Sequence, residues 1–178
     1  MKQKFKSYLE MILIAAAVAA ADQYTKYLIR SNLALGESFA PIESLGSFFR
    51  IVHWKNTGVA FGLFQGHGWV FTLVGLLMVL LIFIFYVTAV TRNAERAVPS
   101  YALAALSLEL GGALGNLIDR LNPDLGYVVD FLWFGSFPVF NLADTAIVIG
   151  AFLLIIYIFN EEKKEKAAEA VKQEGLRE

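Results

Sequence analysis

Four long apolar runs, separated by polar and charged stretches, set the pattern of this chain. They lie at about residues 8–29, 68–90, 99–118 and 139–159. Each is close to the roughly 20 apolar residues that an α-helix needs to cross the hydrocarbon core of a bilayer. The pattern therefore predicts an all-α membrane protein, built as a four-transmembrane-helix bundle.

The connection between the first two apolar runs carries a different pattern. Phe48 to Lys55 is rich in β-branched and aromatic residues, Asn56-Thr57-Gly58 is a turn sequence, and residues 59–64 are apolar again. This succession predicts a small amphipathic β-structure lying against the membrane surface. Three tryptophans fall near the predicted interfaces on the same side, where amphipathic rings are favoured: Trp54, Trp69 and Trp133.

Positive charge is divided unevenly among the connecting segments. The N-terminal residues, the connection between the second and third runs, and the tail hold ten lysines and arginines in about 34 residues. The other two connections hold four in about 58 residues. Because cytoplasmic segments are enriched in Lys and Arg, both termini are predicted to be cytoplasmic and the β-structure extracytoplasmic. We expect residues 1–160 to form one integral membrane domain and residues 161–178 a charged cytoplasmic tail.

The amino-acid composition argues against several classes of function. The net charge is −1 and no basic, aromatic-rich patch occurs, so nucleic-acid binding is not expected. Cysteine is absent, which excludes disulfides, a thiolate nucleophile and a sulfur metal site. The two histidines, His53 and His67, lie in the first connection without HExxH spacing. Two solvated or hydrogen-bonded loop histidines are the simpler interpretation, and neither a metal nor another cofactor is predicted.

Polar side chains are concentrated between Asn116 and Asp144, a stretch that lies between two strongly apolar segments. This stretch holds four aspartates, three asparagines and one arginine. Carboxylates beside a bilayer are expensive, so a functional role is the default hypothesis. Asp130 is predicted to lie in the loop that enters the last apolar run, and Asp144 in the first turns of that run. Gly135 and Pro138 allow the chain to turn back between them. We expect the two carboxylates to converge at the outer leaflet of the membrane that the chain spans.

Two converging carboxylates would share one proton, because neighbours of like charge cannot both ionise cheaply. The ionised partner can draw a proton from water while the protonated partner polarises a scissile carbonyl. Spacing alone leaves three interpretations open. These are a hydrolytic dyad, a proton or cation relay in a small transporter or channel subunit, and a structural network that caps helix ends.

Small and polar residues recur at steps of three and four along the third run, which predicts a stripe facing the bundle interior: Glu109, Gly112, Asn116 and Asp119. Gly111 and Gly115 form a GxxxG motif, which permits close helix contact. In the first run, Asp22 and Lys26 are four residues apart on one helical face, where they can form an ion pair.

Five short motifs, in order along residues 12–158, carry a resemblance to a known family. They are Asp22-Gln23 with Lys26, Asn56-Thr57-Gly58 with Ala60-Phe61, Gly115-Asn116 with Asp119-Arg120, Val129-Asp130-Phe131, and Phe140-Asn141 with Ala143-Asp144. Together they resemble the bacterial lipoprotein signal peptidases (signal peptidase II). Each motif is weak alone, and five in register are specific.

The resemblance implies an aspartic endopeptidase of the bacterial cytoplasmic (inner) membrane. Such an enzyme removes signal peptides from prolipoproteins by cutting before a diacylglyceryl-modified cysteine. Carried over by motif, Asp130 and Asp144 are the expected catalytic dyad. The expected substrate-binding residues are Asn56, Gly58, Asn116, Arg120 and Asn141, and the expected structural supports are Asp22, Lys26 and Asp119.

The implied partners are diacylated prolipoproteins, membrane lipids and globomycin-type cyclic peptide inhibitors. One residue departs from the family pattern: Glu109 stands before Gly111-Gly112 in a region where the family has an apolar residue. A carboxylate at that depth needs a partner or a proton.

Overall fold

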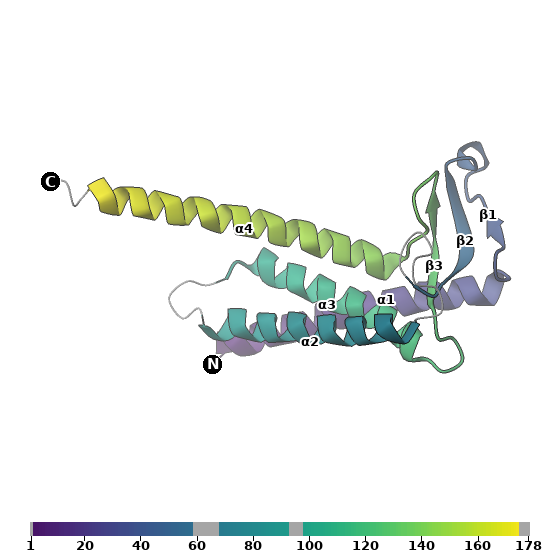
Figure 1. The fold of residues 1–178 in the computed structure, drawn as a ribbon, viewed down its shortest axis with the longest axis horizontal. Helices are drawn as coiled ribbons and strands as arrows, with labels where there is room; N and C mark the ends of the chain where they lie inside the picture. Colours follow the sequence, from purple (N-terminus) through teal and green to yellow (C-terminus); the bar gives the residue numbers. More distant parts are fainter. Residues whose placement is uncertain (1, 59–67, 93–97, 175–178) are drawn as a thin grey trace.

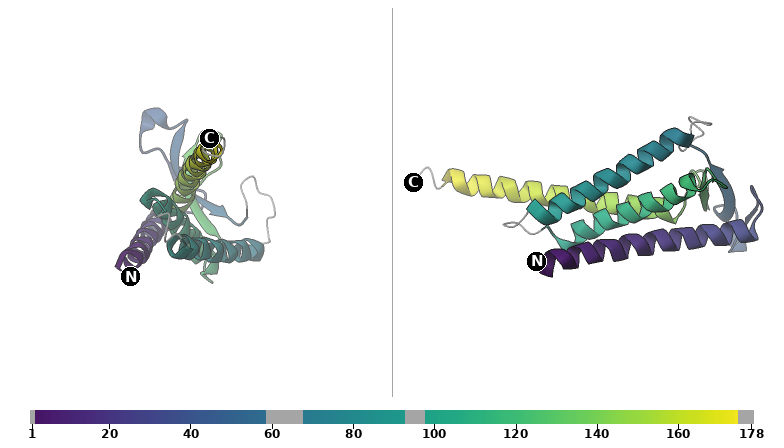
Figure 2. Two further views of the ribbon diagram at one scale, coloured as in Figure 1. Left: turned by 90° about the vertical axis from the view of Figure 1, so that its left-hand side faces the viewer. Right: turned by 90° about the horizontal axis from the view of Figure 1, so that it is seen from below.

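The computed structural model describes residues 2–58, 68–92 and 98–174 (Figure 1). The helices are α1 (Lys2–Asn32), α2 (Gly68–Arg92), α3 (Ser100–Leu121) and α4 (Leu142–Glu174), with a short 3-10 turn η1 (Glu43–Leu45). The strands are β1 (Ser38–Phe39), β2 (Phe49–Asn56) and β3 (Val128–Phe134). The helices run lengthwise, and the sheet lies at the end opposite both termini (Figures 1 and 2).

The chain is mostly helical, as the apolar runs predict, with a small antiparallel sheet. Within the described residues, three helical segments are long and apolar enough to cross a membrane: Trp69–Thr91, Ser100–Leu121 and Leu142–Glu169. Helix α1 is 31 residues long but carries charged residues towards both ends. The membrane character of the fold is therefore evident, whereas a fourth crossing by α1 stays a prediction.

The last helix differs from its expected range at both ends. It begins at Leu142 rather than near residue 139, because Phe140 is still paired with Leu132 in an isolated β-bridge. It then continues without a break to Glu174, so the described part of the charged tail is helical. Within this segment, exposed side chains form local ion pairs, such as Lys166 with Glu162 at 2.6 Å.

Helix α3 lies at the centre of the bundle and packs against the other three helices. Glycines allow this close approach. A Cβ atom at Gly111 would lie 2.7 Å from the Cβ of Val18 on α1, and one at Gly112 would collide with the carbonyl oxygen of Ala143 on α4. A Cβ at Gly115 would lie 2.6 Å from an oxygen of Asp22. The predicted contact at Gly111 and Gly115 is thus made with α1, and Gly112 adds the contact with α4.

The sheet has the order β1-β2-β3, and both pairs of neighbours are antiparallel. Strand β2 corresponds to the β-structure predicted from Phe48 to Lys55, while the apolar residues 59–64 lie outside the described residues. Strand β3 is a correction, because the sequence placed Asp130 in a loop. Residues 128–131 are buried, and the sheet brings a segment before α4 against the first connection. Strand β1 was also not predicted.

Candidate active site

Strand β3 places Asp130 in the interior, where 1% of the residue is exposed. Both carboxylate oxygens accept hydrogen bonds from side-chain amides. The Nδ2 atom of Asn56 donates to Oδ2 at 2.8 Å, and the Nδ2 atom of Asn141 donates to Oδ1 at 2.8 Å. The strand itself is fixed to α3, because the backbone N–H of Val129 donates to Oδ2 of Asp119 at 3.0 Å.

Strand register explains how Asn56 reaches Asp130. Asn56 pairs with Val128, two residues before Asp130, so the two polar side chains lie on one face as diagonal neighbours. The turn that follows sets the orientation of the Asn56 amide. The backbone N–H of Gly58 donates to Oδ1 of Asn56 at 3.1 Å, so the NH2 group is directed towards Asp130.

Asp144 lies in the first turn of α4, where Asn141 caps the helix. The backbone N–H of Asp144 donates to Oδ1 of Asn141 at 2.9 Å, and the backbone N–H of Asn141 donates to Oδ2 of Asp144 at 3.1 Å. This reciprocal pair is a capping box, which satisfies two donors at the helix start. The second carboxylate oxygen, Oδ1, accepts from Nδ2 of Asn116 at 2.7 Å. A helix N-terminus also favours negative charge at this position.

The two carboxylates interact electrostatically. Burial, the larger effect, together with the nearby charge of Asp144 raises the pKa of Asp130 to about 7 from a reference value of 3.8. The amide donors of Asn56 and Asn141 and the positive charge of Lys26 act in the opposite direction. Asp130 therefore exchanges its proton near neutral pH, as expected for a carboxyl group beside a second one.

A buried ion cluster, formed by Asp22, Lys26 and Asp119, supports the two carboxylates. The ammonium of Lys26 lies 2.7 Å from Oδ2 of Asp22 and 3.0 Å from Oδ2 of Asp119, and none of the three side chains is exposed. The same ammonium donates to Oδ1 of Asn116 at 2.9 Å. That oxygen also accepts from Nδ2 of Asn141 at 3.0 Å. Hydrogen bonds thus connect the ion cluster to both carboxylates.

The ion cluster also joins the secondary structure elements. Asp22 on α1 accepts from the backbone N–H of Ala143 at the start of α4, at 3.0 Å. The Nε2 atom of Gln23 donates to Oδ1 of Asp119 at 2.9 Å and to the carbonyl of Gly115 at 3.0 Å. Gln23 was not among the predicted site residues, although its place beside Asp22 in the first motif is a signal for it.

Arg120, on the last turn of α3, lies close enough to Asp144, Asp130 and Asp119 to interact electrostatically with all three. Nine of the ten predicted site residues therefore lie within hydrogen-bonding or electrostatic range of the two carboxylates or of the ion cluster, and the tenth, Gly58, is hydrogen-bonded to Asn56. Glu109 lies elsewhere on α3. It is half-buried beside Gly150 of α4, where a Cβ atom would lie 2.7 Å from its Cγ.

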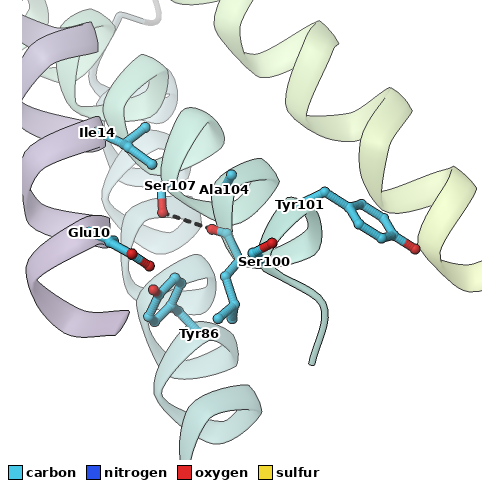
Figure 3. A pocket seen from close by; sticks show the side chains of 8 residues that line it. Glu10, Ile14, Tyr86, Ser100, Tyr101, Ala104 and Ser107 are labelled. Atoms are coloured by element: carbon cyan, nitrogen blue, oxygen red, sulfur yellow. Dashed lines mark hydrogen bonds between the residues drawn. The ribbon is translucent and has the colours of Figure 1, made fainter. Parts of the chain in front are cut away.

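A cavity of about 400 Å³ occurs at the other end of the bundle, between the early part of α1, the end of α2 and the start of α3 (Figure 3). Its polar lining residues are Glu10, Tyr86, Ser100, Tyr101 and Ser107, and no predicted site residue lines it. In the described part of the chain, no group of three or more His, Asp or Glu side chains could hold a metal ion. His53 is buried with Nδ1 2.9 Å from the carbonyl of Leu33, and His67 lies outside the described residues.

Comparisons with known proteins agree with one another. Residues 14–160 match the family model described as signal peptidase (SPase) II. A lipoprotein signal peptidase from Moorella thermoacetica is 46% identical over 143 residues, covering 80% of this chain and 88% of the relative. One from Geobacillus thermodenitrificans is 42% identical over 163 residues, covering 88% and 94%.

Solved structures described as bacterial membrane enzymes are also similar. One has a TM-score of 0.74 at 33% identity and covers 86% of this chain and 90% of the other. A second has a TM-score of 0.66 at 35% identity, with coverage of 83% and 91%. From its sequence and its fold together, the chain belongs to the signal peptidase (SPase) II family.

Proposed function

We propose that this protein is a membrane-embedded aspartic endopeptidase that removes signal peptides from diacylglyceryl-modified prolipoproteins. It cuts the peptide bond before the lipidated cysteine, using Asp130, Asp144 and one water. Membership of the SPase II family supports the protease activity and the prolipoprotein substrate. The observation that carries the proposal is the pair of carboxylates, one on β3 and one in the cap of α4, held by three asparagine amides.

The two carboxylates take different roles in this reaction. Asp130 holds the proton, because burial and the charge of Asp144 raise its pKa to about 7. Asp144, at the N-terminus of α4, is the ionised partner and the base. It removes a proton from the water, whose oxygen attacks the scissile carbonyl carbon while Asp130 donates a hydrogen bond to the carbonyl oxygen. When the C–N bond breaks, Asp144 passes the proton that it took from the water to the departing amine, and the dyad returns to its singly protonated state.

The asparagines and Arg120 surround the place where the peptide would lie. Asn56, Asn116 and Asn141 hold the carboxylates in the described structure, and Gly58 orients Asn56. Direct contact of these residues with the substrate stays a prediction, supported by their position around both carboxylates. A globomycin-type cyclic peptide inhibitor would be expected to occupy the same place.

The membrane arrangement is also part of the proposal. We place both termini in the cytoplasm and the sheet at the outer face of the cytoplasmic (inner) membrane, with α1 as a fourth crossing and residues 1–160 as the membrane domain. The described termini lie at the end of the molecule opposite the sheet, which supports this arrangement (Figure 1). A lipid-bearing substrate would then reach the dyad laterally from the outer leaflet, at a depth where backbone groups still meet water.

The deciding experiment is cleavage of a purified diacylated prolipoprotein by the full chain in detergent or lipid nanodiscs. We expect Asp130→Asn and Asp144→Asn each to abolish cleavage while the proteins still fold and insert. Glu10→Gln, which neutralises a carboxylate in the distant cavity, is the matched control and should cleave normally. Full turnover by either dyad variant would exclude the mechanism. Ion flux that depends on the two aspartates, without cleavage, would favour the competing relay interpretation.

A further inference from the structure

Lys26 has more contacts than a helix–helix ion pair requires. Its ammonium is fully buried and carries three N–H groups, and three acceptors surround it. Two are the carboxylates of Asp22 and Asp119, at 2.7 and 3.0 Å. The third is uncharged: Oδ1 of Asn116, at 2.9 Å. The ion pairs hold helices together, whereas the bond to Asn116 leads towards the dyad.

The contact with Lys26 determines which way the Asn116 amide faces. Its Oδ1 accepts from two donors, the Lys26 ammonium and Nδ2 of Asn141. A flipped amide would present its NH2 group to the ammonium and lose both bonds, inside a site where unpaired polar groups are costly. With Oδ1 held in place, Nδ2 of Asn116 must face the other way, where it donates to Asp144 at 2.7 Å.

The same oxygen also orients Asn141. One NH2 group of Asn141 donates both to Oδ1 of Asn116, at 3.0 Å, and to Oδ1 of Asp130, at 2.8 Å. Its own Oδ1 is occupied by the backbone N–H of Asp144. The buried cation therefore fixes the direction of the Asn116 amide and, together with the backbone N–H of Asp144, that of the Asn141 amide. Each amide presents an N–H donor to a different carboxylate.

We propose that Lys26 is a positioning residue of the dyad, acting through Asn116 and Asn141 to hold one amide donor against each carboxylate. This inference rests on the proposed function, because it assumes that Asp130 and Asp144 carry out the cleavage. It separates two roles within the ion cluster. Asp22 and Asp119 stabilise the fold, while Lys26 also sets the geometry of the reacting groups.

A cation in this position also affects the proton of Asp130. The charged and titratable groups near Asp130 are Asp144 on α4, Lys26 on α1, and Arg120 on α3. Lys26 lowers the pKa of Asp130, in opposition to burial and Asp144. Removing the cation should therefore raise that pKa, and the activity that depends on protonated Asp130 should persist to higher pH.

A double-mutant cycle tests the proposal, with Lys26→Met, Asn116→Ala and the combined variant measured on a fluorogenic diacylated lipopeptide. We expect Lys26→Met to lower kcat by about 10- to 100-fold with little change in KM, less than the loss of a directly acting donor. If Lys26 acts through Asn116, the double variant will have the kcat of Asn116→Ala alone, since the shared pathway is already lost. If the loss of kcat in the double variant equals the product of the losses in the two single variants, the proposal is overturned.

A control separates positioning from stability. Asp119→Asn weakens the ion cluster but leaves the Lys26–Asn116 bond in place. The alkaline limb of the pH–activity profile of this variant, where activity is lost as pH rises, should therefore stay at the wild-type pH. Lys26→Met should move that limb upward. Equal limbs in both variants would mean that Lys26 is only structural.

Lys26→Met alone leaves two buried carboxylates without a cation and can fail to fold. In that case the variant with Lys26→Met, Asp22→Asn and Asp119→Asn removes all three charges together. Adding Asn116→Ala to this triple variant should lower kcat no further. If Asn116→Ala lowers kcat there as much as it does in the wild-type protein, the proposal is contradicted. Cleavage by Asp130→Asn or Asp144→Asn would instead defeat the proposed function itself, so the two failures are distinguishable.

Discussion

The amide of Asn56 offers a direct test of the proton on Asp130. Its Nδ2 donates to Oδ2 of Asp130 at 2.8 Å and stabilises the ionised carboxylate. Asn56→Ala removes this donor while the Asn141 donor on the other oxygen remains. The ionised form loses stability, so the pKa of Asp130 should rise above its present value of about 7.

The size of the shift follows from the hydrogen bond. Bonds to charged groups contribute about 1.5–3 kcal/mol, and one pKa unit corresponds to about 1.4 kcal/mol. The complete loss of this bond would raise the pKa by about one to two units. Asn56 is only half-buried, so water can replace part of the interaction. We therefore expect the lower end of this range, about one unit.

The assay is the pH dependence of kcat/KM for cleavage of a diacylated lipopeptide, fitted as apparent values of the coupled pair. The proposed mechanism requires protonated Asp130, so activity should be present below the pKa of Asp130 and lost above it. In Asn56→Ala the alkaline limb should move to higher pH by about one unit, even though maximal activity falls. Thr57→Ala, in the same turn, is the matched control and should leave the limb in place. An unchanged limb, or one moved to lower pH, would refute the assignment of the proton to Asp130.

Three further outcomes follow from the structure. Because the pKa of Asp130 is raised from 3.8 to about 7, the folded state binds the proton more tightly than the unfolded state. The contribution of Asp130 to the free energy of unfolding should therefore fall by about 3 kcal/mol from pH 4 to 7, and thermal unfolding of Asp130→Asn should lack this pH dependence. Gly112→Ala should force α4 away from α3, because the added Cβ would collide with the carbonyl of Ala143. This variant should lower both the melting temperature and the rate of cleavage. Gly75→Ala is the control and should change neither, because its Cβ would make only an ordinary contact at 3.4 Å. Asp119→Asn should lower yield or melting temperature along with activity, and intact stability with lost turnover would show that its role is not supportive.

The membrane helices are the part of the fold that the sequence predicts most directly. A run of apolar residues needs no distant partner to identify it, because the bilayer itself acts as the solvent. The start of α4 was also available from local chemistry. Asn141 and Asp144 stand three positions apart, as in a capping box, and this signal places the first helical residue at Leu142.

Strand β3 could not be predicted in the same way. Its partner, β2, lies more than 70 positions earlier, and pairing over that separation leaves no local period. The strand is buried from Val128 to Phe131, so it lacks the alternation of a half-exposed strand, and an aspartate interrupts its apolar run. The expectation of a loop around Asp130 was therefore wrong, although the convergence of this segment on the start of α4 was expected.

The ion cluster divides into a local and a distant part. The pair of Asp22 and Lys26 follows from their spacing of four on one helix. The contacts of Lys26 with Asn116 and Asp119 join residues about 90 positions apart, and only the packing of α1 on α3 brings them together. Their assignment to one site came from the resemblance, and the structure supplies the hydrogen bonds.

The outer side of strand β3 has a consequence for how a peptide can be held. This strand ends the three-stranded sheet, and such a border normally invites another chain to pair along it. Here the outward N–H of Val129 is taken by Asp119, and the N–H groups of Phe131 and Leu132 are taken by the carbonyl of Phe140. We therefore expect that an incoming peptide does not extend the sheet beside Asp130. In the proposed reaction, side chains would hold the peptide instead, and the bonded edge of strand β3 is also protected against pairing with another chain.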